Sequence, residues 1–419
     1  MQEIITNSDA QYALEIVKTI CTQVGPGLPG SSQERARAAI IQKELESHLG
    51  AANVAVEEFT LAPDGMLNPY PGLLFMIVAV LLNISIGRFT GLSPWVTAIA
   101  ALVFSILAPL PFIFEFILGY EFIDPLLKKK QSINVIGTLG KPGNRDVKRL
   151  LIVSGHHDSA WEDNWLSWLG YGFFFASATY FIGLLVMLAV SILQLTGLII
   201  GRADLVRAGT LGWALMVYPI LPSMIYLLFQ HRREKGGGSV PGAADNLSAS
   251  ALAVAICRFL VLNPACIPAD TEIRFISFGS EEAGLRGSRR YVARHLDELK
   301  RLQARLLNFE TVAHPEIAIL TSDVNGIVKN SPEMVKSLAA AAERAGVPYQ
   351  LKSASLGVGT DAAPFSRAGL KAATLLPFKV PQQLVAFYHQ KRDRPEVLTI
   401  EPLFNVLKLA LEWIRCSGE

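Results

Sequence analysis

Residues 150–158 read Leu-Leu-Ile-Val-Ser-Gly-His-His-Asp, an apolar run that ends in three polar residues. A short run of this kind is typical of a strand buried on both faces. His156 and Asp158 are two residues apart, so on a strand their side chains point to one side while His157 points to the other. Asp158 can then reach the His156 ring and fix its tautomer, which leaves the second ring nitrogen available for a metal ion.

More acids and a second histidine follow apolar segments further along the chain. Glu281 and Glu282 leave a buried-type strand, and two adjacent acids repel each other unless a cation binds them or they reach solvent. Asp245 is expected to open a helix, where its carboxylate would lie near the positive end of the helix dipole. Glu310 follows Leu306-Leu307, and His389 follows Tyr388. Each signal alone has an ordinary explanation as a cap or surface residue, so only the combination indicates a site.

Strand-like and helix-like segments alternate outside the most apolar regions. Strands are expected at residues 54–61, 132–138, 149–154, 272–277 and 317–321, and helices at 9–22, 33–48, 247–262, 332–345 and 402–415. This alternation predicts an α/β fold, a three-layer sandwich with a mostly parallel central sheet. Sites in such folds lie at the carboxyl ends of the strands, which is where the candidate ligands fall.

The composition is more apolar than that of an ordinary soluble enzyme. The 419 residues are 51% hydrophobic and 18% charged, with a mean hydropathy of +0.35. Two regions, 71–118 and 166–229, supply the excess, and each contains two segments near the roughly 20 residues that a membrane-crossing helix needs. We therefore expect two transmembrane hairpins, broken near residues 87–91 and 201–204, in an integral membrane protein with four transmembrane helices.

The expected hairpins divide the rest of the chain into three pieces. Residues 1–70, 119–165 and 230–419 would lie on one side of the membrane and form a single globular domain. Lysines and arginines at 128–130 and 232–235 flank this domain, whereas the hairpin tips carry few basic residues. The positive-inside rule then predicts that this globular domain is cytoplasmic. The net charge of +2 and the absence of a basic, aromatic-rich patch give no sign of nucleic-acid binding.

The polar motifs together resemble the di-zinc metallopeptidase family of bacterial leucyl aminopeptidases and glutamate carboxypeptidases, metallopeptidase family 28. The matching stretches are 154–159 (SGHHDS), 241–246 (PGAADN), 280–288 (SEEAGLRGS), 359–365 (GTDAAPF) and 388–389 (YH). The resemblance covers nearly all of the chain outside the hairpins, and the Ser-Glu-Glu-Ala-Gly motif is its most specific part. It implies a zinc-exopeptidase fold, and the two hairpins expected from hydropathy would make this chain a membrane-embedded variant.

The resemblance also implies roles for individual residues. One zinc ion would be held by His156, Asp245 and Glu310, and a second by Asp245, Glu282 and His389. Manganese or cobalt are possible substitutes for these ligand types. Glu281 would be the general base. Asp158, which would orient the His156 ring, is the second residue expected to be catalytic. Asp361 and Tyr388 would contact the substrate.

Three positions depart from the family pattern. Glu310 stands where the family more often has Asp, His157 replaces an aromatic residue, and the loop after Asp361 lacks a frequent His. Other functions on the same fold are a glutaminyl-cyclase-like acyltransferase, which uses one zinc ion, and an inactive membrane scaffold or receptor. A small transporter is a further alternative, although the spans carry almost no charge to form a polar pathway.

We therefore expect a membrane-anchored di-zinc exopeptidase. Among exopeptidases, the first expectation is an aminopeptidase, which hydrolyses N-terminal residues from peptides. Because the second hairpin joins Asp158 to Asp245, we expect the partners of the enzyme to include the lipid bilayer and peptides released or tethered there. The alternative is that the spans only anchor the enzyme. Carboxypeptidase or dipeptidase action, the preferred terminal residue, and the oligomeric state stay open at this stage.

Overall fold

The computed structural model describes residues 5–66, 68–86, 91–140, 147–211, 213–230 and 238–417. The chain divides into two compact units. The sheet unit contains Met1–Pro63, Leu126–Glu162 and Gly236–Glu419, and the helical unit contains Asp64–Pro125 and Asp163–Lys235.

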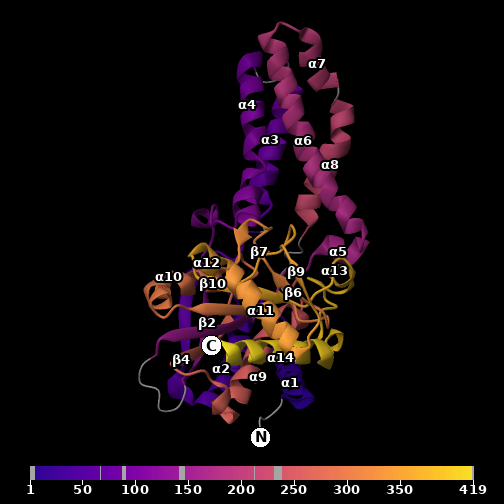
Figure 1. Ribbon diagram of the computed structural model, residues 1–419. Coiled ribbons are helices and arrows are strands. Elements are labelled where there is room, and N and C mark those ends of the chain that lie inside the picture. Colours follow the sequence, from indigo (N-terminus) through magenta and orange to yellow (C-terminus); the bar gives the residue numbers. More distant parts are fainter. Residues whose placement is uncertain are drawn as a thin grey trace. The chain divides into compact units, whose positions relative to one another are not determined.

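An eight-stranded sheet forms the centre of the sheet unit in the described part of the chain (Figure 1). The order is β1-β2-β4-β3-β5-β10-β6-β9. Strands β4, β3, β5 and β10 run parallel to one another, as do β6 and β9. Three pairings are antiparallel: β1 with β2, β2 with β4, and β6 with β10. The expected α/β fold with a mostly parallel sheet is confirmed. The strands are β1 Val54–Leu61, β2 Lys130–Gly140, β3 Arg149–His156, β4 Thr271–Phe278, β5 Arg305–Phe309, β6 Ile317–Leu320, β9 Tyr349–Lys352 and β10 Lys371–Leu376, with a separate pair β7 Ser322–Asp323 and β8 Val328–Lys329.

The register of the central strands brings their carboxyl ends together. His156, the last residue of β3, is aligned with Phe278, the last residue of β4. Ser154 of β3 is aligned with Asn308 of β5, and Glu310 directly follows that strand. Parallel strands end at one edge of a sheet, so the segments after β3, β4 and β5 share this edge.

Both faces of the central strands are buried. Leu151 and Val153 of β3 belong to one hydrophobic cluster, while Leu150 and Ile152 belong to another. Side chains on a strand alternate between its faces, so the two clusters are the two sides of the sheet. Helices α1, α2, α9, α11 and α14 contribute to the first cluster, and α10 and α12 to the second. The arrangement is a helix–sheet–helix sandwich.

The helices of the sheet unit follow the sequence pattern closely. Those expected at 9–22, 33–48, 332–345 and 402–415 are confirmed to within a turn of helix. Ser31 caps α2 because its hydroxyl accepts the N–H of Glu34. The helices are α1 Asn7–Gln23, α2 Ser32–Leu49, α9 Ser248–Leu262, α10 Arg286–Arg301, α11 Pro332–Ala345, α12 Ala362–Arg367, α13 Gln382–Ala386 and α14 Ile400–Cys416.

The expectation that Asp245 opens a helix is wrong. Helix α9 begins at Ser248, and Asp245 lies in a π-type turn, Ala243–Leu247, with φ −113° and ψ 91°. Gly242 before this turn has a φ of +66°, a value that residues with a side chain rarely adopt. The N–H groups of Ala244 and Asp245 donate to the Asp393 carboxylate instead of entering helical geometry.

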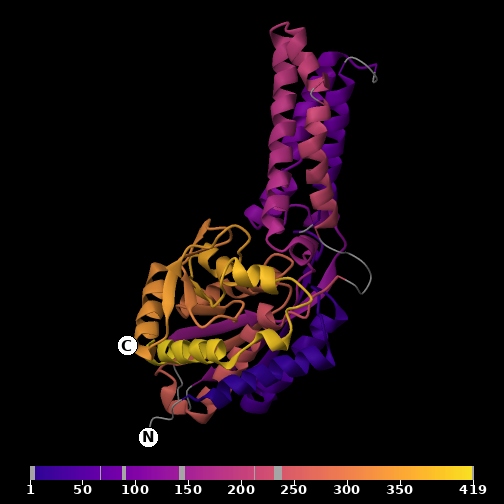
Figure 2. The same cartoon turned by 90° about the vertical axis from the view of Figure 1, so that its right-hand side faces the viewer.

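The helical unit consists of long apolar helices that pack side by side (Figures 1 and 2). Helix α6 packs against α8 and α4, and α3 packs against α4. Instead of a simple turn, the second apolar region has an additional short helix, α7, between α6 and α8. The elements are α3 Tyr70–Ser85, α4 Pro94–Leu107, a π-helical turn Phe112–Ile117, α5 Asn164–Leu169, α6 Gly172–Ile199, α7 Ala203–Leu211 and α8 Trp213–Phe229.

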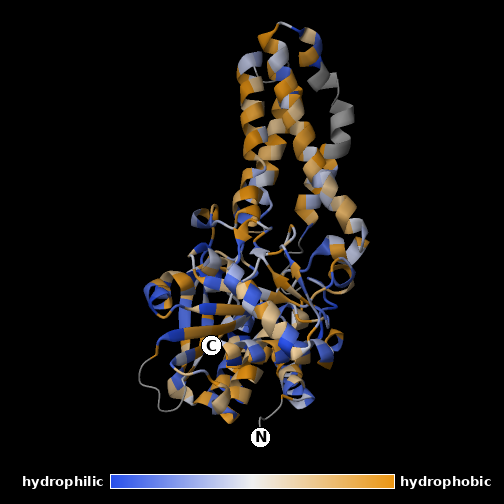
Figure 3. Cartoon of the chain, in the orientation of Figure 1, coloured by the Kyte–Doolittle hydropathy of each residue, from blue (hydrophilic) through white to orange (hydrophobic). Residues whose placement is uncertain are grey.

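The described outer surface of the helical unit is apolar (Figure 3). Leu81, Val96, Phe175 and Leu185 are all exposed, Phe175 by 77%. By length and hydropathy, two segments of this unit could cross a membrane, Pro94–Ile117 and Gly172–Ile199, and Tyr70–Ser85 and Ile220–Phe229 are shorter apolar helices. The segment Ala243–Leu262 also passes this criterion, but it is buried within the sheet unit. Part of the expected break at 87–91 and the basic residues at 232–235 lie outside the described residues.

Several polar side chains in the interior of this unit form hydrogen bonds. Asn83 of α3 donates to the Ser191 hydroxyl of α6 at 3.0 Å, and Ser105 of α4 lies 2.8 Å from the same hydroxyl. Glu115 accepts the backbone N–H of Ile123. Bonds between helices of this kind stabilise helix packing in an apolar setting.

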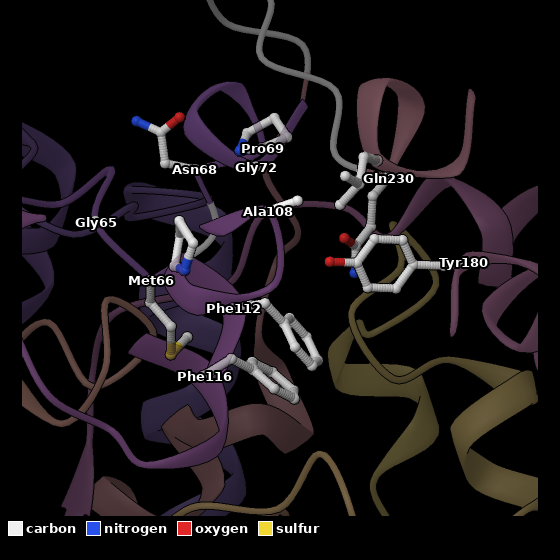
Figure 4. A pocket seen from close by; sticks show the side chains of 12 residues that line it. Gly65, Met66, Asn68, Pro69, Gly72, Ala108, Phe112, Phe116, Tyr180 and Gln230 are labelled. Atoms are coloured by element: carbon white, nitrogen blue, oxygen red, sulfur yellow. The ribbon is translucent and has the colours of Figure 1, made fainter. Parts of the chain in front are cut away.

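A small cavity of about 50 Å³ also lies within the helical unit (Figure 4). The rings of Phe112, Phe116 and Tyr180 line it, together with the amide of Gln230. Pockets that bind drug-sized molecules are several times larger, on the order of 300–1,000 Å³. Its size therefore suits a packing defect rather than a ligand pocket.

Candidate active site

His156 lies at the end of β3 with only 1% of its side chain exposed. Its Nδ1 is 3.3 Å from Oδ1 of Asp158, the neighbour expected to orient the ring. His157 points away from this pair, because its Nδ1 is 2.9 Å from the Ser277 hydroxyl on β4. The strand alternation predicted from residues 156–158 therefore holds.

Asp158 also fixes the turn that carries the two adjacent glutamates. The backbone N–H groups of Glu281 and Glu282 donate to its two carboxylate oxygens, each at 3.0 Å. Ser280 before them has a φ of +54°, and its hydroxyl donates to Glu34 on α2 at 2.7 Å. Hydrogen bonds to Asp158 and Glu34 therefore fix the backbone that carries both glutamate side chains.

The acids and histidines from the different loops meet at the sheet edge. Asp245 is placed between the histidines, with Oδ1 3.4 Å from His156 Nε2 and Oδ2 3.1 Å from His389 Nε2. Glu310 Oε1 and Glu281 Oε2 are each 3.6 Å from His156 Nε2, and Glu282 Oε1 is 3.3 Å from His389 Nε2. The structure thus brings together all seven residues that the sequence suggested for metal binding and proton transfer.

Two groups of three side chains have ligand atoms close enough to hold one ion each. In the first group, His156, Asp245 and Glu310 present atoms within 4.8 Å of one another, and in the second Asp245, Glu282 and His389 do so. Asp245 belongs to both. A third combination of His156, Glu281 and Glu282 meets the same distance criterion, so distance alone does not separate Glu281 from the ligands.

The cluster carries a large excess of buried acid. Burial raises the pKa of the Glu310 carboxyl to about 8, although the His156 ring opposes this shift. Burial raises the pKa of Glu281 well above its usual value, and Glu310 and Glu282 add to the effect while His156 opposes it. Burial should lower the pKa of His389, but Glu282 and Asp245 outweigh it and hold that pKa well above the usual value. A cation placed among these groups would favour their ionised forms.

Several ligand-type atoms in the cluster have no hydrogen-bond partner among the described residues. They are Oδ2 of Asp245, Oε1 of Glu282 and Oε2 of Glu310. Leaving a buried polar atom unpaired costs free energy, so native structures rarely keep several in one place. Imidazole and carboxylate ligands suit zinc, and the observed donor set therefore fits zinc ions.

The two residues expected to contact the substrate lie beside this cluster. Asp361 precedes α12 and is fully buried, and its charge influences the pKa values of Glu281 and Glu310. Tyr388 stacks on the ring of His389, with centroids 4.0 Å apart and planes 11° apart. His389 itself has a left-handed φ of +49°, a conformation that costs a non-glycine residue free energy and is often found at functional sites.

Sequence reasoning missed three buried charged residues behind the cluster. The Asp393 carboxylate accepts the backbone N–H groups of Ala244 and Asp245. The Arg37 side chain on α2 donates to the backbone carbonyls of His157 and Pro241. Asp323 accepts the hydroxyl of Thr360 at 2.6 Å. Local patterns do not identify these residues, since Asp393 and Arg37 bond residues more than 100 positions away in the chain.

The α/β fold with its mostly parallel sheet is similar to that of solved zinc aminopeptidase structures. Residues 227–414 match the family described as "Peptidase family M28". This match confirms the family recognised from the motifs for that stretch, which is less than half of the chain.

Individual proteins with this architecture are similar to the chain. "Aminopeptidase YwaD" of Bacillus subtilis (strain 168) is 33% identical over 166 residues, which is 39% of this chain and 35% of that protein. The match thus spans about a third of that relative's length. The zinc aminopeptidase BSAP from Bacillus subtilis has a TM-score of 0.54 at 17% identity, covering 97% of this chain and 94% of that one. The glutaminyl cyclase of Fimbriiglobus ruber has a TM-score of 0.56 at 12% identity, covering 99% and 97%. At these identities the structural matches show the fold alone.

Proposed function

We propose that the protein is a membrane-anchored di-zinc exopeptidase that acts as an aminopeptidase. The observation that carries the proposal is the pair of three-residue groups that share Asp245. His156, Asp245 and Glu310 would hold one ion, and Asp245, Glu282 and His389 the other. When bound, two such ions supply a water of lowered pKa and a polarised peptide carbonyl.

Glu281 is proposed as the general base. Its Oε2 lies 3.6 Å from His156 Nε2, and its backbone is held by Asp158. The Glu281 carboxylate would take the proton of the attacking water and pass it to the leaving amine nitrogen. Asp158 would act as a positioning group, since it approaches the His156 ring and holds the backbone of both glutamates.

The sign of the charge around the cluster favours a substrate with a free amino terminus. Asp158, Asp245, Glu281, Glu282, Glu310 and Asp361 are all at least 91% buried there. With two zinc ions bound, the positive charge of the ions would offset that of the ligand carboxylates. The remaining negative charge would come from carboxylates that hold no ion, such as Asp361, and these attract an ammonium group and repel a terminal carboxylate. This argument supports aminopeptidase over carboxypeptidase action.

The test is a hydrolysis assay on the full chain in detergent after loading with zinc. We expect release of the first residue from peptides with a free amino terminus, and no release from the same peptides after amino-terminal acetylation. Activity should be lost on chelation and return with zinc. Loss of ammonia from an amino-terminal glutamine, without hydrolysis, would instead establish the glutaminyl cyclase alternative. A zinc-loaded chain with neither activity would favour the inactive scaffold.

Asp361 is proposed to bind the substrate's ammonium group, and Tyr388 to line the same pocket. Neither carboxylate oxygen of Asp361 makes a well-aligned hydrogen bond in the described part of the chain, although the Ser288 hydroxyl lies nearby. A charge-assisted hydrogen bond contributes about 1.5–3 kcal/mol, so Asp361→Asn should raise KM for free amino termini roughly tenfold or more. Steady-state kinetics checks this, and an unchanged KM would contradict the assignment.

The helical unit is proposed to cross the bilayer four times through α3, α4, α6 and α8, with the catalytic domain in the cytoplasm. The apolar exposed side chains of these helices support membrane insertion. The connection of this unit to the metal ligands along the chain supports peptides at the membrane as substrates.

Cysteine labelling tests the orientation. In a chain with its native cysteines replaced by alanine, a cysteine at Asp204, in the first turn of α7, should react with an impermeant maleimide in intact cells. A cysteine at Lys300 on α10 should react only after permeabilisation. The reverse pattern would place the catalytic domain outside the cytoplasm, and labelling of both positions in intact cells would contradict a spanning topology.

A further inference from the structure

Arg37 is a fully buried arginine that links three separate loops. Its Nε donates to Gly25 O at 2.8 Å, Nη1 to His157 O at 3.2 Å, and Nη2 to Pro241 O at 2.5 Å. It makes no salt bridge with any described residue. A buried charge without an ion pair costs free energy. The three hydrogen bonds that the guanidinium donates to backbone carbonyls offset this cost, and they indicate that Arg37 holds these loops together.

Two of these acceptors lie beside the proposed ligands. His157 stands between His156 and Asp158, and Pro241 precedes the turn that presents Asp245. Gly242 packs against the same guanidinium, because a Cβ there would lie 3.5 Å from Arg37 Nη1 and 2.7 Å from Asp245 O. Arg37 therefore joins the loop after β3 to the turn before α9.

Asp393 holds that turn through its backbone N–H groups. Its Oδ1 accepts the N–H of Ala244 at 2.7 Å and its Oδ2 accepts the N–H of Asp245 at 3.1 Å. The Asp393 carbonyl also accepts the N–H of Ala243 at 3.3 Å. Because Asp393 lies four residues after His389, it ties the His389 loop to the residue proposed to bridge the ions.

The charges of the two side chains complement each other. Asp158, Asp393 and Glu34 all stabilise the Arg37 cation at longer range, while burial opposes it and lowers its pKa to about 10. Replacing either side chain would leave backbone groups of the ligand loops without a partner, and such groups are costly when buried.

We propose that Arg37 and Asp393 are positioning residues that set the distance of Asp245 from His156 and from His389. The inference rests on the proposed function, since it assigns them to the assembly of the zinc centre. Residues that orient metal ligands typically contribute about 10–100-fold to metal affinity. We expect both to influence zinc affinity beyond their effect on folding.

The experiment measures the zinc dissociation constant of the full chain by chelator competition, together with Tm without zinc. Arg37→Lys keeps the charge but loses the fork, and Asp393→Asn keeps the shape but offers one acceptor oxygen instead of two. Both should weaken zinc binding about 10–100-fold. Excess zinc should restore part of kcat. Arg274→Lys is the matched control, because Arg274 bonds Glu298 and Tyr291 within the sheet unit and contacts none of the ligand loops.

The outcomes separate the two proposals. Weaker zinc binding in both variants, with a lower Tm but unchanged zinc affinity in Arg274→Lys, supports the inference. Unchanged zinc affinity in Arg37→Lys and Asp393→Asn overturns it, as does an equal loss in the control. A wild-type chain that does not bind zinc would refute the proposed function itself.

Discussion

Glu281→Gln is expected to lower kcat by about 10²–10⁴-fold while the chain keeps its zinc. The amide has nearly the same shape as the carboxylate but cannot take a proton from water. Glu281 lies outside the two groups that share Asp245, so the ions should remain bound. The measurements are kcat on a peptide with a free amino terminus and zinc content by elemental analysis.

Glu298→Gln is the matched control for this change. It is the same substitution on α10, where Glu298 pairs with Arg274 rather than with the cluster, and it should leave kcat unchanged. Loss of zinc together with activity in Glu281→Gln would show that Glu281 is a ligand. The distances permit that result, because Glu281 also lies near His156 and Glu282.

Asp245→Ala is expected to remove both zinc ions and nearly all activity. One carboxylate belongs to both groups of candidate ligands, with its two oxygens 3.4 Å and 3.1 Å from the two histidines. Bound metal ions contribute several kcal/mol to such reactions, so kcat/KM should fall by about 10³-fold or more. Zinc titration and kinetics on the same preparation check both parts.

Glu310→Ala provides the comparison that tests bridging. Glu310 belongs to only one of the two groups that share Asp245, so this variant should lose one ion and keep the other. If Asp245→Ala kept one ion at wild-type affinity, Asp245 would not be a bridging ligand. If Glu310→Ala lost both ions, binding of the second ion would depend on binding of the first.

The strand ends that carry the site could be predicted because local patterns determine them. The run at 150–153 is apolar at every position, which matches a strand buried on both faces, and β3 is buried from Leu150 to His156. Alternation then placed His156 and Asp158 together and His157 on the opposite face. Adding the family motifs was enough to name the acids that gather at this edge.

The turn at Asp245 could not be predicted in the same way. Small and polar residues before an apolar helix are typical of a helix start, and that pattern suggested the wrong position for the start of α9. The actual conformation depends on Asp393, which is 148 positions away in the chain. Hydropathy has a comparable limit, because the segment Ala243–Leu262 is long and apolar enough to be a candidate span but is buried in the sheet unit.

The order of the segments also has a consequence for biogenesis. His156 and Asp158 are synthesised before the apolar insert at Asp163–Lys235, while Asp245, Glu310 and His389 follow it. A nascent chain therefore cannot bring together all the candidate metal ligands until that insert has left the ribosome. If the insert enters the membrane as proposed, zinc binding would follow the start of its integration. The proteolytic activity proposed for this chain would then be absent from the incomplete polypeptide.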